Sequence, residues 1–566
     1  MRLRKNIFRA TTFTLVGVFG IGAIFAVNSL PQEETTAVSG SWANFVSTAW
    51  MNDSDARYKN YTETPGSSES SPYLIKTAEE FSGIRAFESG SALAGKYMML
   101  ANDIDLSAHY WDPIELYGAG DSEDDMYNID YSNDNWLSGD EETVHFDGNS
   151  VKITGMVVDN VYDQVLIYAN EPWGDYAWPV EAGSTGLFSF AYKARIANVN
   201  LVSPKITLSE TSGIEATGDL GWREIDVMDV AGTIVGASHN SRVINTHVSD
   251  PQIDYTASFG EAIDDNDYHY APSRIMVGGM VGYAFGQTVA SNSSIKGGAI
   301  NVAPIVNETL IDDEGDIWMG SLDEGGVAVG GIVGFNYQSV VLSTCNGSDI
   351  SFTDAGYTLN SNRGNEVEKS FALNSYQVAV GGIVGNSSTQ YSFQACIYNS
   401  CAHSTLSVRT TQIGESYTGG IVGVLADDSM INNYFDGNFA STGMYVGEIV
   451  GGLYTDPADG YVIASNYYLD RGTDPYGTSY EASYGGFGVI TTTAKLTDDL
   501  NAGRQAVIKD SFGHAAGELS EEFLESQVAT WAIQDGSHPL DCVGSLKVGL
   551  VSPNTESIVV PDTGAK

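Results

Sequence analysis

The sequence predicts an all-β protein whose body is a solenoid of repeated coils, and three observations lead to that prediction. A glycine-rich phrase recurs along the chain, and an alternation of small or polar with apolar residues follows each copy. The composition also suits short strands and turns, since glycine reaches 63 residues and only 17% of the chain is charged. Apolar residues make up 42%, which is enough to build a large core despite the negative charge.

The recurring phrase is Gly-Gly-apolar-Val-Gly. Clean copies begin 52, 51 and 38 residues apart, at Gly278–Gly282, Gly330–Gly334, Gly381–Gly385 and Gly419–Gly423. Degenerate copies occur at Gly186–Ser189, Ala231–Gly236 and Gly447–Gly451. An apolar pair between glycines fits a buried strand, and the glycines allow positive φ or close approach of neighbouring coils. A flexible linker is the alternative, but linkers lack regularly placed Ile and Val.

Alignment of the copies on their last glycine predicts ladders of side chains on successive coils. The position eleven residues later is occupied by His247, Ser293, Cys345, Cys396 and Tyr434. The position two residues earlier is occupied by Asn245, Ser291, Ser343, Gln394 and Asn432. Cys345 and Cys396 share a column and could form a disulfide if their coils touch, or they could both be small apolar fillers. His247 is interpreted as a structural polar residue.

These phrases resemble the GLUG repeat of bacterial surface proteins. Residues 73–114 are similar to the module that commonly precedes those repeats, Phe146–Met156 to its continuation, and Trp531–Leu540 to the terminal strand of such arrays. The resemblance spans roughly residues 72–545. It implies a right-handed parallel β-helix-like solenoid at the bacterial surface, often in adhesins or in the non-catalytic parts of larger enzymes.

A short helix-containing cap is expected before the first coil. Thr77 and Glu80 form a capping box, and Ala78, Phe81 and Ile84 follow at helical spacing. Lys96–Leu100 is expected to be a strand, and a cap here would close the exposed edge of the solenoid.

The first residues predict export. Arg2, Arg4, Lys5 and Arg9 precede the uncharged run Thr12–Val27, which is the order of a secretory signal peptide; an uncleaved membrane anchor is the alternative. Residues 1–29 hold four of the 26 basic residues and none of the 72 acidic ones, so the net charge falls from -46 to -50 after their removal. Such a charge argues against nucleic-acid binding.

The expected organisation follows from these features. We divide the chain into signal peptide 1–29, linker 30–71, cap module with an acidic insert 72–160, solenoid 161–470, C-terminal strands or cap 471–550 and polar tail 551–566. The tail ends in Val-Pro-Asp-Thr-Gly, and Pro561, Thr563 and Gly564 match the sorting signal at which sortases attach proteins to the cell wall. The match is either functional, with cleavage after Thr563, or a coincidence in a polar tail.

The acidic insert, residues 121–142, is a candidate calcium site. Side chains of the types found at positions 1, 3, 5, 7, 9 and 12 of an EF-hand-like loop occur at Asp130, Ser132, Asp134, Trp136, Ser138 and Glu141. Asn135 stands where glycine is expected, and no convincing flanking helices are present. A solvated acidic loop is the alternative to calcium binding.

Common catalytic signatures are absent from the sequence, including the zinc-binding H-E-x-x-H, the Walker loop, the G-x-S-x-G elbow and paired C-x-x-C. We therefore expect a non-catalytic surface adhesin or interaction scaffold, with no cofactor besides calcium, that binds glycans or surface proteins. Aromatic segments such as Tyr168–Trp178 and Tyr268–Tyr270 are candidate contact surfaces, unless they pack beneath their loops. An extracellular β-helix glycan lyase or hydrolase is the first alternative, and a structural surface-layer protein the second.

Overall fold

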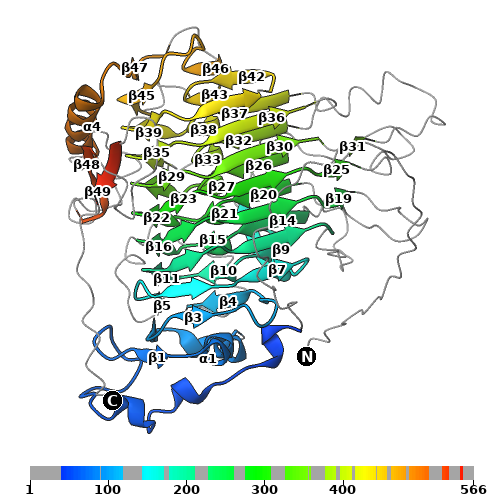
Figure 1. Cartoon of the computed structure of the whole chain (residues 1–566), viewed down its shortest axis with the longest axis vertical. Helices are drawn as coiled ribbons and strands as arrows, with labels where there is room; N and C mark the ends of the chain where they lie inside the picture. Colours follow the sequence, from blue (N-terminus) through cyan, green and yellow to red (C-terminus); the bar gives the residue numbers. More distant parts are fainter. Residues whose placement is uncertain are drawn as a thin grey trace, which may run out of the picture. The chain divides into compact units, whose positions relative to one another are not determined.

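The protein is a parallel β-helix solenoid, shown in Figure 1. The computed structural model describes residues 40–88, 91–118, 143–170, 177–210, 227–259, 274–306, 326–354, 356–357, 377–389, 396–410, 415–441, 443–455, 461–479, 484–508, 526–533 and 548–551. All of these belong to one compact unit, residues 38–566. The predicted signal peptide, the candidate calcium residues 130–141 and the sorting motif 560–564 lie outside the described residues.

Each complete coil contributes one strand to each of five parallel sheets, which we call walls 1 to 5 in chain order. Wall 1 contains β8 Asp163–Asn170, β9 Ala177–Thr185, β14 Val227–Gly232, β20 Arg274–Gly278, β26 Gly326–Gly330, β32 Gln377–Gly381, β37 Glu415–Gly419 and β42 Tyr445–Gly447. Wall 2 contains β4 Ile114–Tyr117, β10 Phe188–Tyr192, β15 Val235–His239, β21 Val281–Phe285, β27 Val333–Tyr337, β33 Val384–Ser388, β38 Val422–Ala426, β43 Val450–Leu453 and β46 Tyr476–Ser479.

The other three walls complete the coil. Wall 3 contains β1 Tyr73–Ile75, β2 Tyr97–Leu100, β5 Val144–Asp147, β11 Ala194–Ala197, β16 Arg242–Ile244, β22 Val289–Ser291, β28 Val340–Leu342, β34 Cys396–Tyr398, β39 Ser429–Ile431 and β44 Ile463–Ala464. Wall 4 contains β3 Ile104–Asp105, β6 Lys152–Thr154, β12 Asn200–Val202, β17 His247–Ser249, β23 Ser294–Lys296, β29 Cys345–Asn346, β35 Cys401–Ala402, β40 Tyr434–Phe435, β45 Asn466–Tyr468 and β47 Phe487–Val489. Wall 5 contains β7 Val157–Asp159, β13 Lys205–Leu208, β18 Gln252–Tyr255, β24 Ala299–Val302, β30 Asp349–Thr353, β36 Thr405–Arg409 and β41 Asn438–Ser441.

Pairs of strands within the walls are parallel except for the hairpin of β8 and β9. Three short strands extend some coils beyond wall 5: β19 Ser258–Phe259, β25 Ile305–Val306 and β31 Gly356–Tyr357. Inward-pointing residues of every wall form one continuous core; in the coil that contains β20, they include Ile275, Val277, Ile295 and Ile300. Each coil buries its apolar residues against the next, as the repeat predicts.

The glycines of the repeated phrase bring walls 1 and 2 together. A Cβ atom on Gly278 would lie 1.8 Å from the carbonyl oxygen of Val281 and 2.7 Å from the nitrogen of Gly334 in the next coil. One on Gly334 would lie 2.8 Å from the nitrogen of Val277. None of the glycines in the four clean copies has positive φ, so close approach of the backbones is what requires them. We call this meeting of walls 1 and 2 the glycine corner.

A second corner lies between walls 3 and 4. On successive coils, one residue has a left-handed backbone conformation there. Its residues have φ between 48° and 63°: Asn198, Asn245, Asn292, Ser343, Asn399, Asn432 and Ser465. Asparagine tolerates this conformation and can hydrogen-bond along the column. Asn245 Nδ2 donates to Asn198 Oδ1 at 2.6 Å, and Asn432 Nδ2 donates to Asn399 Oδ1 at 2.7 Å. We call it the asparagine corner.

The N-terminal cap is larger than the sequence predicted. The helix α1, Ala78–Ser82, begins with the Thr77 side chain accepting a hydrogen bond from the backbone N–H of Glu80, as expected. Segment 40–71, which lies within the expected linker, instead forms part of the cap. Its 3-10 turns Trp42–Asn44, Ala49–Met51 and Ala56–Tyr58 place two tryptophans and a tyrosine in the core. Two further 3-10 turns follow at Gly83–Phe87 and Ser91–Leu93.

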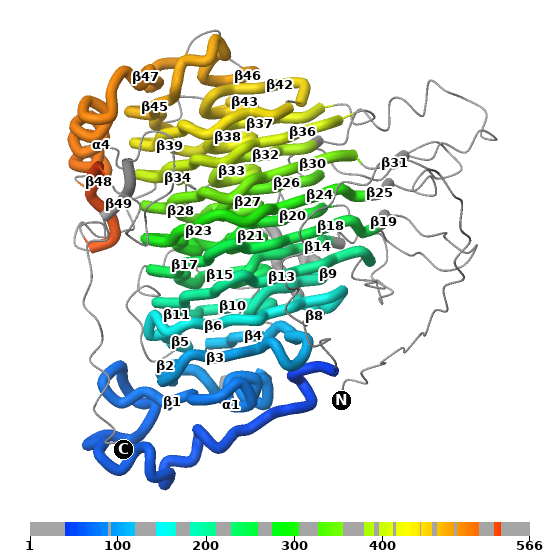
Figure 2. The backbone as a smooth tube through the Cα atoms, in the orientation of Figure 1, coloured from blue at the N-terminus to red at the C-terminus, as the bar shows by residue number. Residues whose placement is uncertain are grey.

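The C-terminal segment, expected to form strands or a cap, contains a helix and packs on the side of the solenoid (Figure 2). It consists of the helix α4, Thr493–Ile508, and the antiparallel pair β48, Thr530–Ile533, and β49, Val548–Val551. Trp531 Nε1 donates to Asn399 Oδ1 at 2.6 Å, and Asn432 Nδ2 donates to the carbonyl of Leu500 at 2.8 Å. No helix among the described residues has the length and apolar composition needed to cross a membrane.

The disulfide lies elsewhere than the sequence suggested. Cys345 is bonded to Cys401 and not to the buried Cys396, so the suggested Cys345–Cys396 pair is wrong. Seven residues separate β33 from β34, whereas two separate β27 from β28 in the preceding coil. These five extra residues shift the register, so that Cys396 pairs with Val340 of wall 3 and Cys401 with Cys345 of wall 4.

Candidate functional site

The outward side chains of walls 1 and 2 pack on each other at the glycine corner. They form an apolar cluster separate from the solenoid core, with Val165, Met228, Val230 and Met276 contributed by wall 1. Wall 2 contributes a row of rings, which we call the aromatic stripe: Tyr117, Phe190, Tyr192, His239, Tyr283, Phe285, Phe335 and Tyr337. This corner therefore presents aromatic rings in a column that follows the solenoid axis.

Stacked contacts connect the stripe. Ring centroids of His239 and Phe285 lie 4.4 Å apart with an interplanar angle of 17°, and those of Tyr283 and Phe335 lie 5.4 Å apart at 10°. Most of the rings are buried, but Tyr117, Phe335 and Tyr337 are half-buried. The stripe ends at β33, where Asn386 and Ser388 take the positions of the rings.

His239 behaves as one more aromatic ring of the stripe. Burial lowers its pKa to about 3, and the nearby Lys193 ammonium acts in the same direction. The imidazole is therefore neutral at ordinary pH. Its Nε2 atom is buried and has no hydrogen-bond partner within the described part of the chain.

Farther along the corner, a second group of rings belongs mainly to wall 1. Tyr417 stacks on Tyr445 with centroids 5.1 Å apart, and its ring lies 6.1 Å from that of Tyr454. The hydroxyl of Tyr454 donates to that of Tyr417 at 3.1 Å, which donates to Glu415 at 2.6 Å. Tyr445, Tyr454 and Glu415 are half-buried, so this tyrosine cluster combines accessible ring faces with a chain of polar groups.

A group of carboxylates lies at the opposite end of the stripe, beside Tyr117. Glu88 accepts a hydrogen bond from the backbone N–H of Glu115 at 3.3 Å and lies 3.4 Å from the guanidinium of Arg85. Burial raises the pKa of Glu88 to about 7; Arg85 opposes this shift, whereas the charges of Asp163 and Glu115 add to it. A carboxyl group with such a pKa can hold a proton near neutral pH.

Neither the aromatic stripe nor the group of carboxylates around Glu88 was predicted from the sequence. The predicted calcium residues, the sorting residues and Tyr268–Tyr270 all lie outside the described part of the chain. A sequence signal for the stripe did exist. The first and third residues after the last glycine of the phrase are Tyr283 and Phe285 in one coil and Phe335 and Tyr337 in the next.

Comparison with known proteins gives little information on function. No family model matches the chain, and no curated protein matches it. One solved structure is similar, a "putative immunoglobulin A1 protease" from Bacteroides ovatus. The two share 16% sequence identity with a TM-score of 0.33, over 78% of this chain and 90% of that one.

Proposed function

We propose that this chain is an exported bacterial surface protein that acts as a non-catalytic, adhesin-like interaction scaffold and binds glycans at the tyrosine cluster. The observation that carries the proposal is the cluster itself. Tyr445 and Tyr454 are half-buried, and the hydroxyls of Tyr454 and Tyr417 lead to Glu415. The apolar face of a sugar ring can stack on such rings while its hydroxyls bond to the polar groups.

The scaffold supports this proposal through its rigidity. Tyr417 and Tyr445 occupy paired positions on neighbouring wall 1 strands, so the backbone ladder fixes the spacing of their rings. A site on strands loses little conformational entropy when it binds. Tyrosine rings on neighbouring coils suit a polymer better than a small ligand, since successive sugar units can contact successive coils.

Export and attachment belong to the same proposal. The basic and then apolar N-terminal order favours secretion, and the resemblance to GLUG proteins favours the bacterial surface. Sortase and the cell wall would be partners if the motif that contains Pro561, Thr563 and Gly564 is functional. The ligand would then be a glycan of a host, a neighbouring cell or the matrix.

The first experiment is retention of the chain from residue 40 onward on a panel of bacterial and host glycans, with the masses of the glycans recorded before and after. Tyr445→Ala and Tyr454→Ala should each weaken retention on the bound glycan about fivefold, because a stacked ring contributes roughly 1 kcal/mol. Tyr97→Ala is a matched control, since Tyr97 is half-buried and stacked on His145 but lies on wall 3. Unchanged retention by both cluster variants would refute the proposed site.

Calcium binding is a separate proposal for the acidic insert. The ligands would be Asp130, Ser132, Asp134, Trp136, Ser138 and Glu141, with Trp136 contributing its backbone carbonyl. Thermal melts with calcium and with chelator should then differ by several degrees, because a ligand that binds only the folded state stabilises it. The double variant Asp130→Asn, Glu141→Gln should abolish the difference. Identical melts of the unmodified chain would contradict calcium binding.

A glycan-cleaving enzyme is the second candidate, and the carboxylate group at Glu88 favours it. Glycoside hydrolysis commonly uses two carboxyl groups, one protonated near neutral pH. Smaller glycan products that vanish in Glu88→Gln and Glu115→Gln, but persist in Glu79→Gln, would establish an enzyme in place of a scaffold. Glu79 is the control because it is an exposed acid of the same cap.

A further inference from the structure

A second site lies on the opposite side of the coil, beneath the C-terminal segment. We propose that Cys345, Cys401 and His403 bind a zinc ion when the two thiols are reduced, at the place where the oxidised chain holds its disulfide. The site is independent of the glycan surface, because it belongs to wall 4.

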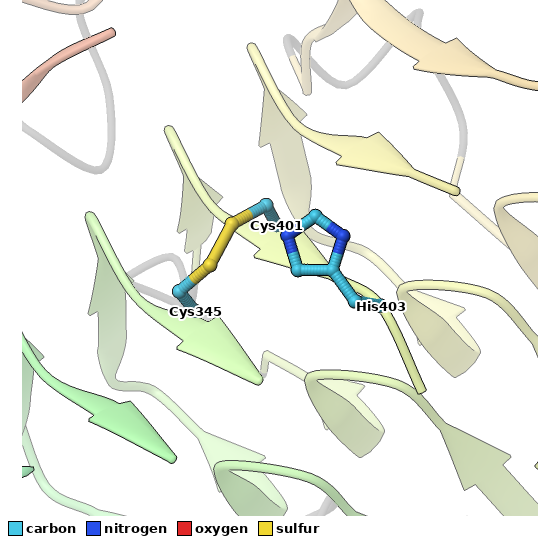
Figure 3. A group of neighbouring side chains, drawn as sticks. All are labelled: Cys345, Cys401 and His403. Atoms are coloured by element: carbon cyan, nitrogen blue, oxygen red, sulfur yellow. A yellow bond between two sulfur atoms is a disulfide. The ribbon is translucent and has the colours of Figure 1, made fainter. Parts of the chain in front are cut away.

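The three potential ligand atoms already converge. The two sulfur atoms and one ring nitrogen of His403 all lie within 4.8 Å of one another. In Figure 3 the outer ring nitrogen of His403, Nε2, lies on the side of the two sulfur atoms. Tetrahedral zinc with sulfur and nitrogen ligands places neighbouring ligand atoms about 3.5 to 3.8 Å apart. Small side-chain rotations would therefore suffice once the bond between the sulfur atoms is broken.

The other ring nitrogen is held as zinc sites require. His403 Nδ1 is hydrogen-bonded to a carboxylate oxygen of Asp436, and both side chains are almost fully buried. A carboxylate on Nδ1 fixes the tautomer that leaves Nε2 as the electron-pair donor, and most zinc-binding histidines have such a partner. The hydroxyl of Tyr434 lies 3.2 Å from Nε2 and would yield that position to the metal.

The surroundings favour a bound cation. Two thiolates would place two negative charges in a buried site, which the two positive charges of a zinc ion would offset. Leu496 and Leu500 of α4 and Trp531 of β48 cover the cysteines. A water molecule would complete the tetrahedron.

The two states exchange by balanced chemistry. A dithiol reductant transfers two electrons and two protons to the disulfide, giving two thiols and the cyclic disulfide of the reductant. Zinc binding then releases the two thiol protons. In the reverse direction a disulfide oxidant accepts two electrons from the two thiolates and becomes a dithiolate, which takes up two protons; the sulfur–sulfur bond of the chain re-forms and the metal is expelled. The site thus retains zinc only in the reduced chain.

The test compares metal content in the two redox states of the full chain. Reduced chain incubated with zinc and then desalted without oxygen should retain one more zinc per chain than oxidised chain, by elemental analysis. Cobalt in place of zinc should give a thiolate-to-cobalt absorption band, which the acidic surface cannot produce. Cys401→Ser and His403→Gln should lose the extra metal. Asp436→Asn should weaken its affinity 10- to 100-fold.

Two variants serve as matched controls. Cys396→Ser removes a buried cysteine that lies outside the Cys345–Cys401 disulfide, and His247→Gln removes a wall 4 histidine three coils away from Cys401; both variants should keep the metal. If the reduced chain unfolds without metal, zinc should restore its circular dichroism. Equal metal content in the two redox states, retention by His403→Gln, or a reduced chain that stays unfolded with zinc would each overturn the proposal.

Discussion

The two sharp corners of the coil solve the same geometric problem in different ways. At the glycine corner, walls 1 and 2 of successive coils approach until no Cβ atom fits, as at Gly278 and Gly334. At the asparagine corner, the chain turns through positive φ, and side chains such as Asn245 and Asn432 bond along the column. The first corner depends on the absence of side chains, and the second depends on their presence.

This difference explains why aromatic rings gather outside one corner and the C-terminal segment packs outside the other. The close approach at the glycine corner brings two outward faces together, which creates the aromatic stripe and the tyrosine cluster. The asparagine corner instead leaves amide groups available on the outside of the coil, and the C-terminal segment bonds to that of Asn399 through Ala529 and Trp531. One corner is filled by rings from the coils themselves, and the other by a segment distant in sequence.

The largest expected effect comes from adding a methyl group at the glycine corner. In Gly330→Ala the new Cβ would lie 1.8 Å from the carbonyl oxygen of Val333 and 2.7 Å from the nitrogen of Gly385, both backbone atoms that cannot rotate away. We expect a loss of more than about 3 kcal/mol in the free energy of unfolding, measured by denaturant titration. Gly485→Ala is the control, because nothing lies within 4 Å of its added Cβ. Equal stability of the two variants would show that the corner is not close-packed.

A substitution at the asparagine corner should destabilise the C-terminal segment before it destabilises the coils. Asn399→Ala removes bonds to Ser343, Asn432, Ala529 and Trp531 and forces alanine to adopt φ of 54°. We expect about 3 kcal/mol of destabilisation, since buried partners are left unsatisfied. Hydrogen exchange should show α4 and β48 losing protection before the coils do.

Asn245→Ala sharpens this comparison, because Asn245 is half-buried and, among the described residues, makes its side-chain hydrogen bonds to Asn198 and His247 rather than to the C-terminal segment. It should cost only about 1 kcal/mol and leave the exchange of α4 unchanged. Faster exchange of α4 in Asn245→Ala, or slow exchange in Asn399→Ala, would contradict the docking role assigned to the corner.

Low pH should lower the free energy of unfolding through protonation of His239 at the glycine corner. The pKa of this histidine is lowered from 6.5 to about 3, so the folded state disfavours the proton that the unfolded chain binds. Stability is therefore complete above about pH 6.5 and falls as the pH drops, by about 2 kcal/mol at pH 5. His239→Phe should flatten this part of the stability curve measured by urea titration, whereas His247→Gln should not. A curve in His239→Phe as steep as that of the unmodified chain would refute the burial argument.

The repeat predicted the solenoid because glycine spacing and strand alternation act locally and recur. The predicted column of side chains matches the asparagine corner at Asn245, Ser343 and Asn432. Extra residues before β22 and before β34 displaced the column in those two coils, from Ser291 to Asn292 and from Gln394 to Asn399. Insertions in an array change register without changing the pattern, which is also why the disulfide partner of Cys345 was missed.

The features that the sequence did not predict depend on contacts between segments that are distant in the chain. The group of carboxylates combines Glu88 of the cap with Glu115 and Asp163, which come from separate segments of the chain. In the same way α4 packs on wall 4 through residues 401 and 496, which are distant in sequence. No spacing rule connects such positions. Trp42 and Trp50 did carry a signal, since two tryptophans in a supposed linker indicate a packed segment.

The smallest expected effect is a pH dependence of opposite sign at the other end of the glycine corner. The pKa of Glu88 is raised from 4.5 to about 7, so its contribution to stability is complete below about pH 4.5 and is lost as the pH rises through 7. Because the side chain is 15% exposed and Arg85 compensates part of the charge, we expect a loss on the order of 1 kcal/mol between pH 5 and 8. Glu88→Gln should remove this loss and become more stable than the unmodified chain at pH 8, while Glu79→Gln should match it. If Glu88→Gln is instead destabilised at pH 8, the carboxylate is held charged by Arg85, and the acid role that favours a glycan-cleaving enzyme loses its support.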